Sequence, residues 1–126
     1  MKSVSPILWT KDIDETVRFY QDTLGFSPRS NFPDFVSLSN GNVEIMFIKP
    51  RSPAENCLPE GQDFFPQPLL TGSLFILMSD VDDFWNVIKD KVNVKTSLAD
   101  REYLMRDFSI LDNNGYELVF GQDISC

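Results

Sequence analysis

Carboxylates are the side chains in this sequence with the greatest capacity for chemistry. The 126 residues include 19 Asp and Glu but no His, so a zinc, nickel or iron site would lack the imidazole ligands that these metals commonly use. Carboxylates suit Mg²⁺, Ca²⁺ or Mn²⁺ better, and a desolvated pair of them can work as acid and base. The usual pairs of nucleophile and base are missing. We therefore expect no catalytic residue, and the sequence favours a protein that is not an enzyme.

Two of these carboxylates lie in a sequence segment that occurs twice in the chain. Residues 34–47 and 107–120 align without a gap at a spacing of 73, and each copy starts with Asp-Phe and carries a Glu, Glu44 or Glu117, before a final Phe. Each copy alternates apolar and polar residues and is interrupted by Asn and Gly. This pattern predicts two antiparallel strands joined by a turn.

A helix is predicted ahead of each hairpin. Residues 5–24 and 73–92 align at a spacing of 68. Both segments carry apolar residues at helical spacing, namely Ile13, Val17, Tyr20 and Leu24 in the first and Val81, Trp85, Ile88 and Val92 in the second. Asp12 and Asp80 stand where an N-cap side chain accepts a hydrogen bond from the first turn. We expect the five extra residues of the second half to lie in residues 95–102.

The chain therefore reads as two modules, residues 1–49 and 72–122, each with the order strand, helix, strand, strand, strand. The expected strands are 4–10, 26–30, 35–39, 42–49, 73–79, 94–97, 103–111 and 116–121, and the expected helices are 12–24 and 81–92. Residues 50–71 form a connector that holds five of the eight prolines. A connector of this length is usually functional or mobile, and we expect its Phe64 and Phe65 to cap a cavity or to contact a partner subunit.

Composition limits the classes of partner and the compartment. The length suits one domain, residues 1–126, and the two cysteines, Cys57 and Cys126, are expected to be free thiols in a reducing compartment. No signal peptide or membrane span is apparent, so we expect a cytoplasmic protein. A net charge of −8 argues against nucleic acid. It would suit a cationic ligand, or it is solubilising surface charge.

Two segments carry a resemblance to a known family. Within residues 11–26, Lys-Asp-Ile, Phe-Tyr and Leu-Gly-Phe resemble the first-helix signature of the vicinal oxygen chelate superfamily, which includes glyoxalases, dioxygenases and bleomycin-resistance proteins. Within residues 106–122, Arg-Asp-Phe, Asp-Asn-Asn-Gly-Tyr and Phe-Gly-Gln resemble the closing hairpin of the bleomycin-resistance-like branch, whose turn is usually Asp-Pro-Asp-Gly. The resemblance implies an α+β fold in which two βαβββ modules form a curved mixed sheet around a cleft, with helices on the outer face.

The same resemblance implies where a metal would lie. In metal-dependent members a divalent ion is held by a His or similar ligand at the start of the first and fifth strands and by a Glu on the last strand of each half. Mapped by the motifs, these positions are Ser5, Ser73, Met46 and Val119, and none is a credible ligand. Glu44 and Glu117 lie two residues away on the same faces, where only serines could assist them. We expect no metal and no other cofactor.

Strand alternation predicts which side chains line the cleft. An apolar row suited to lie under the helices is formed by Phe108, Ile110, Leu118 and Phe120, so the alternate residues face the cleft. The predicted ligand-binding residues are Ile7, Trp9, Glu44, Met46, Phe75, Asp107, Glu117 and Val119. This lining suits an apolar or aromatic, and also a cationic, small molecule. A core or interface role for Trp9 and Phe75, and a solvated rim position for Glu44 and Glu117, are the alternatives.

These observations lead to three hypotheses. The first is a metal-free binding protein that sequesters an aromatic or cationic compound, such as an antibiotic, as bleomycin-resistance proteins do. The second is a metal-dependent lyase or dioxygenase of the same superfamily with carboxylate ligands. The third is an interaction module whose cleft is filled by its own side chains. We expect a homodimer, because a small duplicated unit leaves sheet edges and apolar residues that need cover.

Overall fold

The structure is a computed structural model that describes residues 1–50 and 70–126. The chain divides into two compact units, Met1–Pro68 and Leu69–Cys126, and each contains one of the predicted modules. Most of the predicted connector, including Cys57, Phe64 and Phe65, falls on residues 51–69 and lies outside the described residues.

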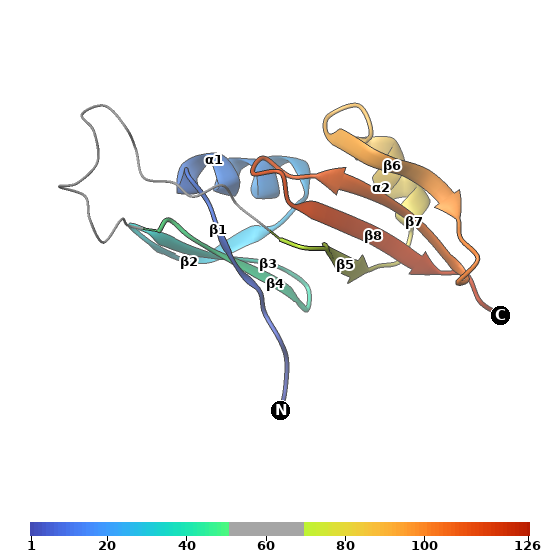
Figure 1. The fold of residues 1–126 in the computed structure, drawn as a ribbon, viewed down its shortest axis with the longest axis horizontal. Coiled ribbons are helices and arrows are strands. Elements are labelled where there is room, and N and C mark those ends of the chain that lie inside the picture. Colours follow the sequence, from blue (N-terminus) through green and yellow to red (C-terminus); the bar gives the residue numbers. More distant parts are fainter. Residues whose placement is uncertain (51–69) are drawn as a thin grey trace. The chain divides into compact units, whose positions relative to one another are not determined.

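The first unit is one four-stranded mixed sheet with a helix on one face (Figure 1). Its elements are β1 (Ile7–Trp9), α1 (Ile13–Arg18), a π-helical turn η1 (Phe19–Thr23), β2 (Ser27–Phe32), β3 (Phe35–Asn40) and β4 (Val43–Ile48). The strand order is β1-β4-β3-β2. The first strand runs parallel to β4, and the other neighbours are antiparallel.

The second unit repeats this arrangement. Its elements are β5 (Ser73–Leu77), α2 (Val81–Ile88), β6 (Asn93–Asp100), β7 (Met105–Leu111) and β8 (Glu117–Asp123), in the strand order β5-β8-β7-β6. Again the first strand is parallel to the last, and the other pairs are antiparallel. The predicted α+β fold of two βαβββ modules is therefore confirmed.

The gap-free alignment of the two hairpins is wrong by one residue in its first strand. Ser37 pairs with Met46 in the first sheet, and Ser109 pairs with Val119 in the second, so β3 and β7 are offset by 72 residues while β4 and β8 are offset by 73. The cause is the turn. The first hairpin closes around two residues, whereas the second closes around three and ends in Gly115 at a φ of 93°, a conformation that glycine adopts without strain.

Several predicted boundaries also move. The strand predicted over residues 4–10 is ordered as β1 only over Ile7–Trp9, and α2 ends at Ile88 rather than Val92. By contrast, β6 is twice as long as the predicted strand, because its far end continues to pair with β7 up to Asp100 and Arg106. Neither helix among the described residues is long and apolar enough to cross a membrane.

Each unit has its own core between helix and sheet. In the first, the ring of the fully buried Tyr20 contacts Phe26 and Phe47, with centroid distances of 5.4 and 5.2 Å. In the second, the apolar row predicted to lie under the helix is buried and consists of Phe108, Ile110, Leu118 and Phe120. The rings of Phe108 and Phe120 contact the α2 side chains Trp85 and Phe84. Strand alternation therefore turns the neighbouring residues to the face opposite the helix.

The two helices are capped in different ways. Asp12 caps α1 as predicted, since its carboxylate accepts a hydrogen bond of 3.1 Å from the Glu15 N–H. Asp80 does not cap α2, because it adopts a left-handed φ of 55° instead of the extended conformation that an N-cap requires. The side-chain oxygen of Gln122 on β8 replaces it and accepts a 3.0 Å hydrogen bond from the Val81 N–H. The prediction for Asp80 is therefore wrong.

Substitution of Gln122 by alanine is expected to destabilise the protein by about 1 kcal/mol, since α2 then loses its side-chain cap. The free energy of unfolding can be measured with urea. Gln122→Glu is the matched control, because it keeps an acceptor oxygen near the positive end of the helix, and it should retain wild-type stability. An alanine variant as stable as the wild type would show that the cap contributes nothing.

Candidate functional site

The eight predicted ligand-binding residues all lie on what we call the open face of each sheet, the face opposite its helix. In the first unit the exposed Ile7 and Trp9 alternate with the buried Leu8 on β1, and Ile7 pairs with Met46 on the neighbouring β4. Glu44 is two residues from Met46 and shares its face. The first sheet therefore brings together four of the predicted residues on one surface.

The other four predicted residues lie on the open face of the second sheet. Phe75 pairs with Val119, and Glu117 lies two residues before Val119 on β8. Asp107 is next to the core residue Phe108 on β7 and points the opposite way by alternation. The two sets belong to separate units, so each is described here as a site of its own.

Glu44 is held by two serine hydroxyls on the first open face. The Ser5 Oγ donates to Oε1 at 2.7 Å, and the Ser37 Oγ donates to Oε2 at 2.6 Å. These hydrogen bonds, with that of Ser37 as the largest cause, hold the pKa of the Glu44 carboxyl below its ordinary value, and the positive charge of Arg29 adds a smaller effect in the same direction. Among the residues that the structure describes, no lysine or arginine forms an ion pair with this carboxylate. Glu44 therefore presents a negative charge that is fixed in position and not neutralised by contact.

The other two predicted carboxylates differ from Glu44 because each contacts a cation. Glu117 accepts a hydrogen bond of 3.2 Å from Lys95. Asp107, only 4 % exposed, accepts one of 2.8 Å from the Arg101 Nε. Their charges are thus already paired within the second unit.

The second open face also carries a residue that sequence reasoning missed. The Tyr103 hydroxyl donates a 2.6 Å hydrogen bond to Asp107 Oδ2, although 63 % of the tyrosine surface is exposed. Tyr103 lies in the turn between β6 and β7, next to Leu104, which has a left-handed φ of 62°. No motif marks this turn in the sequence. The sequence offers one signal, an aromatic residue four positions before the Asp of the repeated Asp-Phe motif.

Phe75 lies against the backbone of β8 at Gly121. A Cβ atom added at Gly121 would lie 2.6 Å from the Phe75 Cζ and 3.3 Å from the Met105 Cε, both closer than ordinary contact. Glycine at this position therefore makes the space that the ring occupies. Because Gly121 pairs with Asp107, the Phe75 ring and the anchored Tyr103 hydroxyl belong to neighbouring positions of one open face.

We expect the Tyr103 phenol to ionise above its ordinary pKa. Its hydrogen bond to Asp107 favours the protonated form, and ionisation would place a phenolate against a carboxylate. The stabilisation is therefore present below the pKa of an unfolded tyrosine and is lost as the pH rises through the higher folded value. NMR titration of ¹³C-labelled tyrosine can measure this pKa. Asp107→Asn should lower it toward the ordinary value, and equal values in both proteins would contradict the anchoring.

The side chains at the positions implied for a metal do not fit a divalent ion. The pairing of Ile7 with Met46 and of Phe75 with Val119 aligns the two halves as the motifs do. Each half therefore has one serine and one apolar residue at the two positions implied for metal ligands. Ser5 already donates to Glu44. Within residues 1–50 and 70–126, no group of three or more His, Cys, Asp or Glu could hold a metal. The donor chemistry therefore gives no basis for a metal-dependent step.

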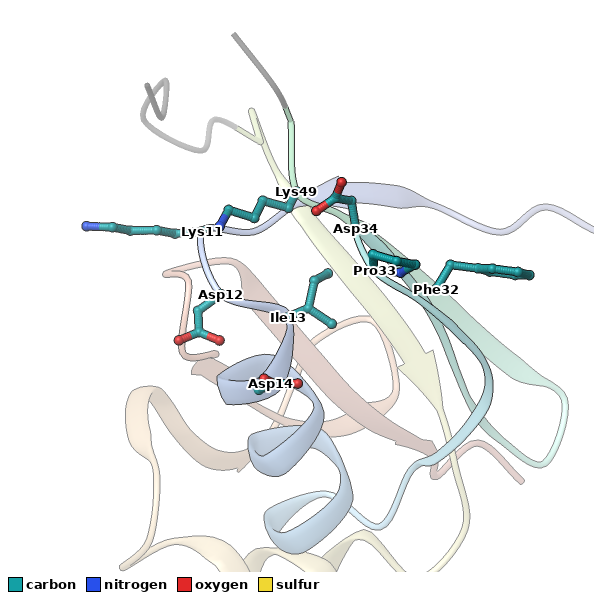
Figure 2. Close-up of a pocket in the computed structure, with 8 residues that line it drawn as sticks. All are labelled: Lys11, Asp12, Ile13, Asp14, Phe32, Pro33, Asp34 and Lys49. Carbon is teal, nitrogen blue, oxygen red and sulfur yellow. The ribbon is translucent and has the colours of Figure 1, made fainter. Parts of the chain in front are cut away.

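A groove of about 570 Å³ lies elsewhere in the first unit, between the start of α1 and the β2–β3 turn (Figure 2). It is lined by Lys11, Asp12, Ile13, Asp14, Phe32, Pro33, Asp34 and Lys49, and by none of the eight predicted residues. The Asp12 carboxylate is already used as the cap of α1, and Figure 2 shows the Lys11 side chain extending outward. The lining thus carries two lysines and three aspartates.

Comparison with known proteins identifies a family. A family model described as the Glyoxalase/Bleomycin resistance protein/Dioxygenase superfamily matches residues 3–120. No curated protein matches the chain.

Solved structures resemble the fold over almost its whole length. A protein of unknown function from Agrobacterium tumefaciens is 24% identical, with a TM-score of 0.76 and coverage of 97% of this chain and 94% of that one. A glyoxalase/bleomycin resistance protein/dioxygenase from Alicyclobacillus acidocaldarius is 18% identical, with a TM-score of 0.72 and coverage of 99% and 96%. A bleomycin resistance determinant encoded on transposon Tn5 is 18% identical, with a TM-score of 0.69 and coverage of 98% of both chains.

Proposed function

The chain belongs to the glyoxalase/bleomycin resistance protein/dioxygenase superfamily, and on that premise we propose that it is a metal-free protein that binds a small aromatic or cationic molecule. Sequestration of an antibiotic is the biological role that we infer, by analogy with the Tn5 determinant that shares its fold. The proposal includes a homodimer in the cytoplasm. It is carried by Glu44, whose charge is fixed by two hydroxyls and forms no direct ion pair in the described part of the chain.

The surroundings of Glu44 favour an organic cation over a hydrated metal ion. Ile7 and Met46 lie on the same face, and Trp9, 42 % exposed, offers an indole surface. An aromatic ring face attracts a cation that sheds water easily, and apolar neighbours favour burial of a carbon framework. A carboxylate whose two oxygens each accept one serine hydrogen bond still has acceptor capacity for an ammonium or guanidinium group.

Isothermal titration of the purified protein with bleomycin and with ethidium, an aromatic cation, tests this function. We expect saturable binding that is equal in buffer containing EDTA and in buffer containing Mg²⁺. The same protein, purified without chelator, should carry less than one bound metal ion per chain in elemental analysis. Stoichiometric metal that is lost in both Glu44→Gln and Glu117→Gln would contradict the metal-free proposal, and a glyoxalase assay of that protein would then test the carboxylate-bound metalloenzyme. Absence of binding by both probes would remove the support for sequestration.

The dimer has a separate test. Light scattering at micromolar concentration should give a mass near twice the 14.4 kDa of the chain. A monomeric mass would contradict this part of the proposal while leaving ligand binding unaffected.

A further inference from the structure

The dipeptide Asn-Gly occurs twice in the chain, at residues 40–41 and 114–115. Each copy lies at the turn between the last two strands of its unit. Asparagine is especially prone to deamidation when glycine follows it, because a residue without a side chain leaves its backbone nitrogen free to approach the asparagine amide. The duplication therefore places the same reactive dipeptide in two turns whose hydrogen bonds can be compared.

The first Asn-Gly is open to solvent and weakly held. Asn40 and Gly41 are both exposed, and a Cβ atom added at Gly41 would meet no atom within 4 Å. In the described part of the chain, the Gly41 N–H donates no hydrogen bond. Asn40 forms the closing pair of the β3–β4 ladder with Val43, and the end of a hairpin is where local opening costs least. The Gly41 nitrogen can therefore reach the Asn40 amide after a small local opening.

The second Asn-Gly is held by Asp112, which is only 6 % exposed. The Asp112 Oδ1 accepts hydrogen bonds from the backbone N–H groups of Asn114 at 2.8 Å and Tyr116 at 2.9 Å. The reactive nitrogen itself, that of Gly115, donates a 3.0 Å hydrogen bond to the Asp112 carbonyl. Attack on the Asn114 amide requires this turn to open, which leaves buried acceptors unpaired.

The reaction needs no reagent except water. The Gly41 backbone nitrogen attacks the side-chain carbonyl carbon of Asn40 and forms a new C–N bond. The bond from that carbon to the amide nitrogen breaks, and ammonia leaves with the proton that Gly41 gives up. Water then opens the resulting cyclic succinimide at either carbonyl, so the product is aspartate or isoaspartate.

We propose that Asn40 is a site of spontaneous deamidation and that Asp112 protects Asn114 from the same reaction. The two turns share the sequence Asn-Gly and differ in the hydrogen bonds that hold the glycine nitrogen and its neighbours. Ligand binding plays no part in this modification, which is therefore independent of the proposed function.

Conversion of Asn40 would remove a contact between two parts of the first unit. The Asn40 Nδ2 donates a 3.3 Å hydrogen bond to the carbonyl of Gly25, which follows η1. A carboxylate at residue 40 has no hydrogen to donate and would face that carbonyl oxygen. Isoaspartate would also lengthen the backbone at the end of β3, next to the pair formed by Ser39 and Glu44. Both products should therefore be less stable than the unmodified protein.

Incubation of the full chain in mildly alkaline buffer, followed by tandem mass spectrometry of its tryptic peptides, tests the proposal. In the native protein, Asn40 should deamidate about tenfold faster than Asn114, because the hydrogen bonds around Asp112 must open first. In concentrated urea the two rates should agree within about threefold, since only the shared sequence remains. No conversion of Asn40, equal rates in the native protein, or the same ratio of rates in urea would overturn the proposal.

Variants of Asp112 test the protection directly. Asp112→Ala should raise the rate at Asn114 toward that at Asn40, whereas Asp112→Asn keeps a side-chain oxygen that can accept the same hydrogen bonds and should protect almost as well. An unchanged rate at Asn114 in a folded Asp112→Ala protein would contradict the proposed protection. The comparison of native and urea-unfolded wild type decides the question if Asp112→Ala does not fold.

The structural consequence has its own test. Asn40→Asp copies the aspartate product and should lower the equilibrium constant for folding about fivefold, as expected for the loss of one hydrogen bond. Asn42→Asp is the matched control, because it makes the same change of charge at an exposed residue of the same turn, and it should retain wild-type stability. Equal stability of the two variants in urea unfolding would contradict the role of the contact with Gly25.

Discussion

Ethidium is expected to bind the Glu44→Gln variant about tenfold more weakly than the wild type, since a hydrogen bond to a charged partner contributes more than a neutral one. The wild-type carboxylate is ionised, as the hydrogen bonds from Ser37 and Ser5 keep its pKa below the ordinary value. It is also already oriented, so a bound cation need not order it. Glutamine is nearly isosteric but neutral, and its amide NH₂ cannot accept the serine hydroxyl hydrogen that the lost oxygen accepted.

The matched control for this prediction is Glu117→Gln. Glu117 is the repeat partner of Glu44 but contacts Lys95, and neutralising it removes an exposed ion pair of small energetic value. Isothermal titration should show a change of less than about twofold in ethidium affinity for this variant. A similar loss in both variants would mean that ethidium responds to overall negative charge rather than to the site on the first sheet.

The difference between the two glutamates comes from their neighbours across the sheet. Ser37 and Ser109 occupy equivalent positions, as shown by their pairing with Met46 and Val119. Ser37 donates to Glu44, whereas the Ser109 hydroxyl forms its hydrogen bond with Thr96 on β6. Glu117 therefore has no serine donor on β7 to hold it and pairs with lysine instead. Two halves with the same fold have thus acquired different electrostatic properties.

The sequence was sufficient to predict on which face of its sheet each strand residue lies, because the alternation of side chains along a strand is a local property. Leu8 is buried and Ile7 and Trp9 are exposed, as the two-residue period requires. The duplication was equally visible, since its motifs lie within single elements. A residue insertion in the second turn was missed because the repeated Asp-Phe at residues 34 and 107 favoured an alignment without a gap.

The partners of the polar side chains could not be predicted in the same way. Gln122 caps α2 although it lies 41 residues from Val81 in the sequence. No residue near Asp80 indicates that its left-handed backbone conformation prevents it from acting as the cap. Arg101 and Tyr103 reach Asp107 only because a turn with Leu104 at positive φ brings them over β7. Such contacts depend on side-chain rotamers and turn geometry, which composition and periodicity do not encode.

Substitution of Arg101 by alanine is expected to destabilise the protein by about 2–3 kcal/mol, the largest stability effect among the site residues. Removal of Arg101 leaves the buried charge of Asp107 without its partner. Such a loss costs about 3–5 kcal/mol when both partners are fully buried. The Asp107 side chain is 5% exposed, but that of Arg101 is 26% exposed, so water replaces part of the lost interaction. Arg101 also loses its hydrogen bond to the Ser97 carbonyl. Urea unfolding of both proteins measures the difference.

A double-mutant cycle separates the ion pair from these additional contacts. Arg101→Ala combined with Asp107→Ala removes both charges, so the double variant should be less destabilised than the sum of the two single variants by about 1 kcal/mol or more. Arg101→Lys is the second comparison, since it keeps the charge but loses the planar guanidinium that donates to Asp107 and Ser97 together, and we expect it to recover only part of the stability. Strict additivity in the cycle would show that Arg101 and Asp107 act independently. In that case the carboxylate of Asp107 would not depend on Arg101 for its stability, and the hydrogen bond from Tyr103 would be its main side-chain contact.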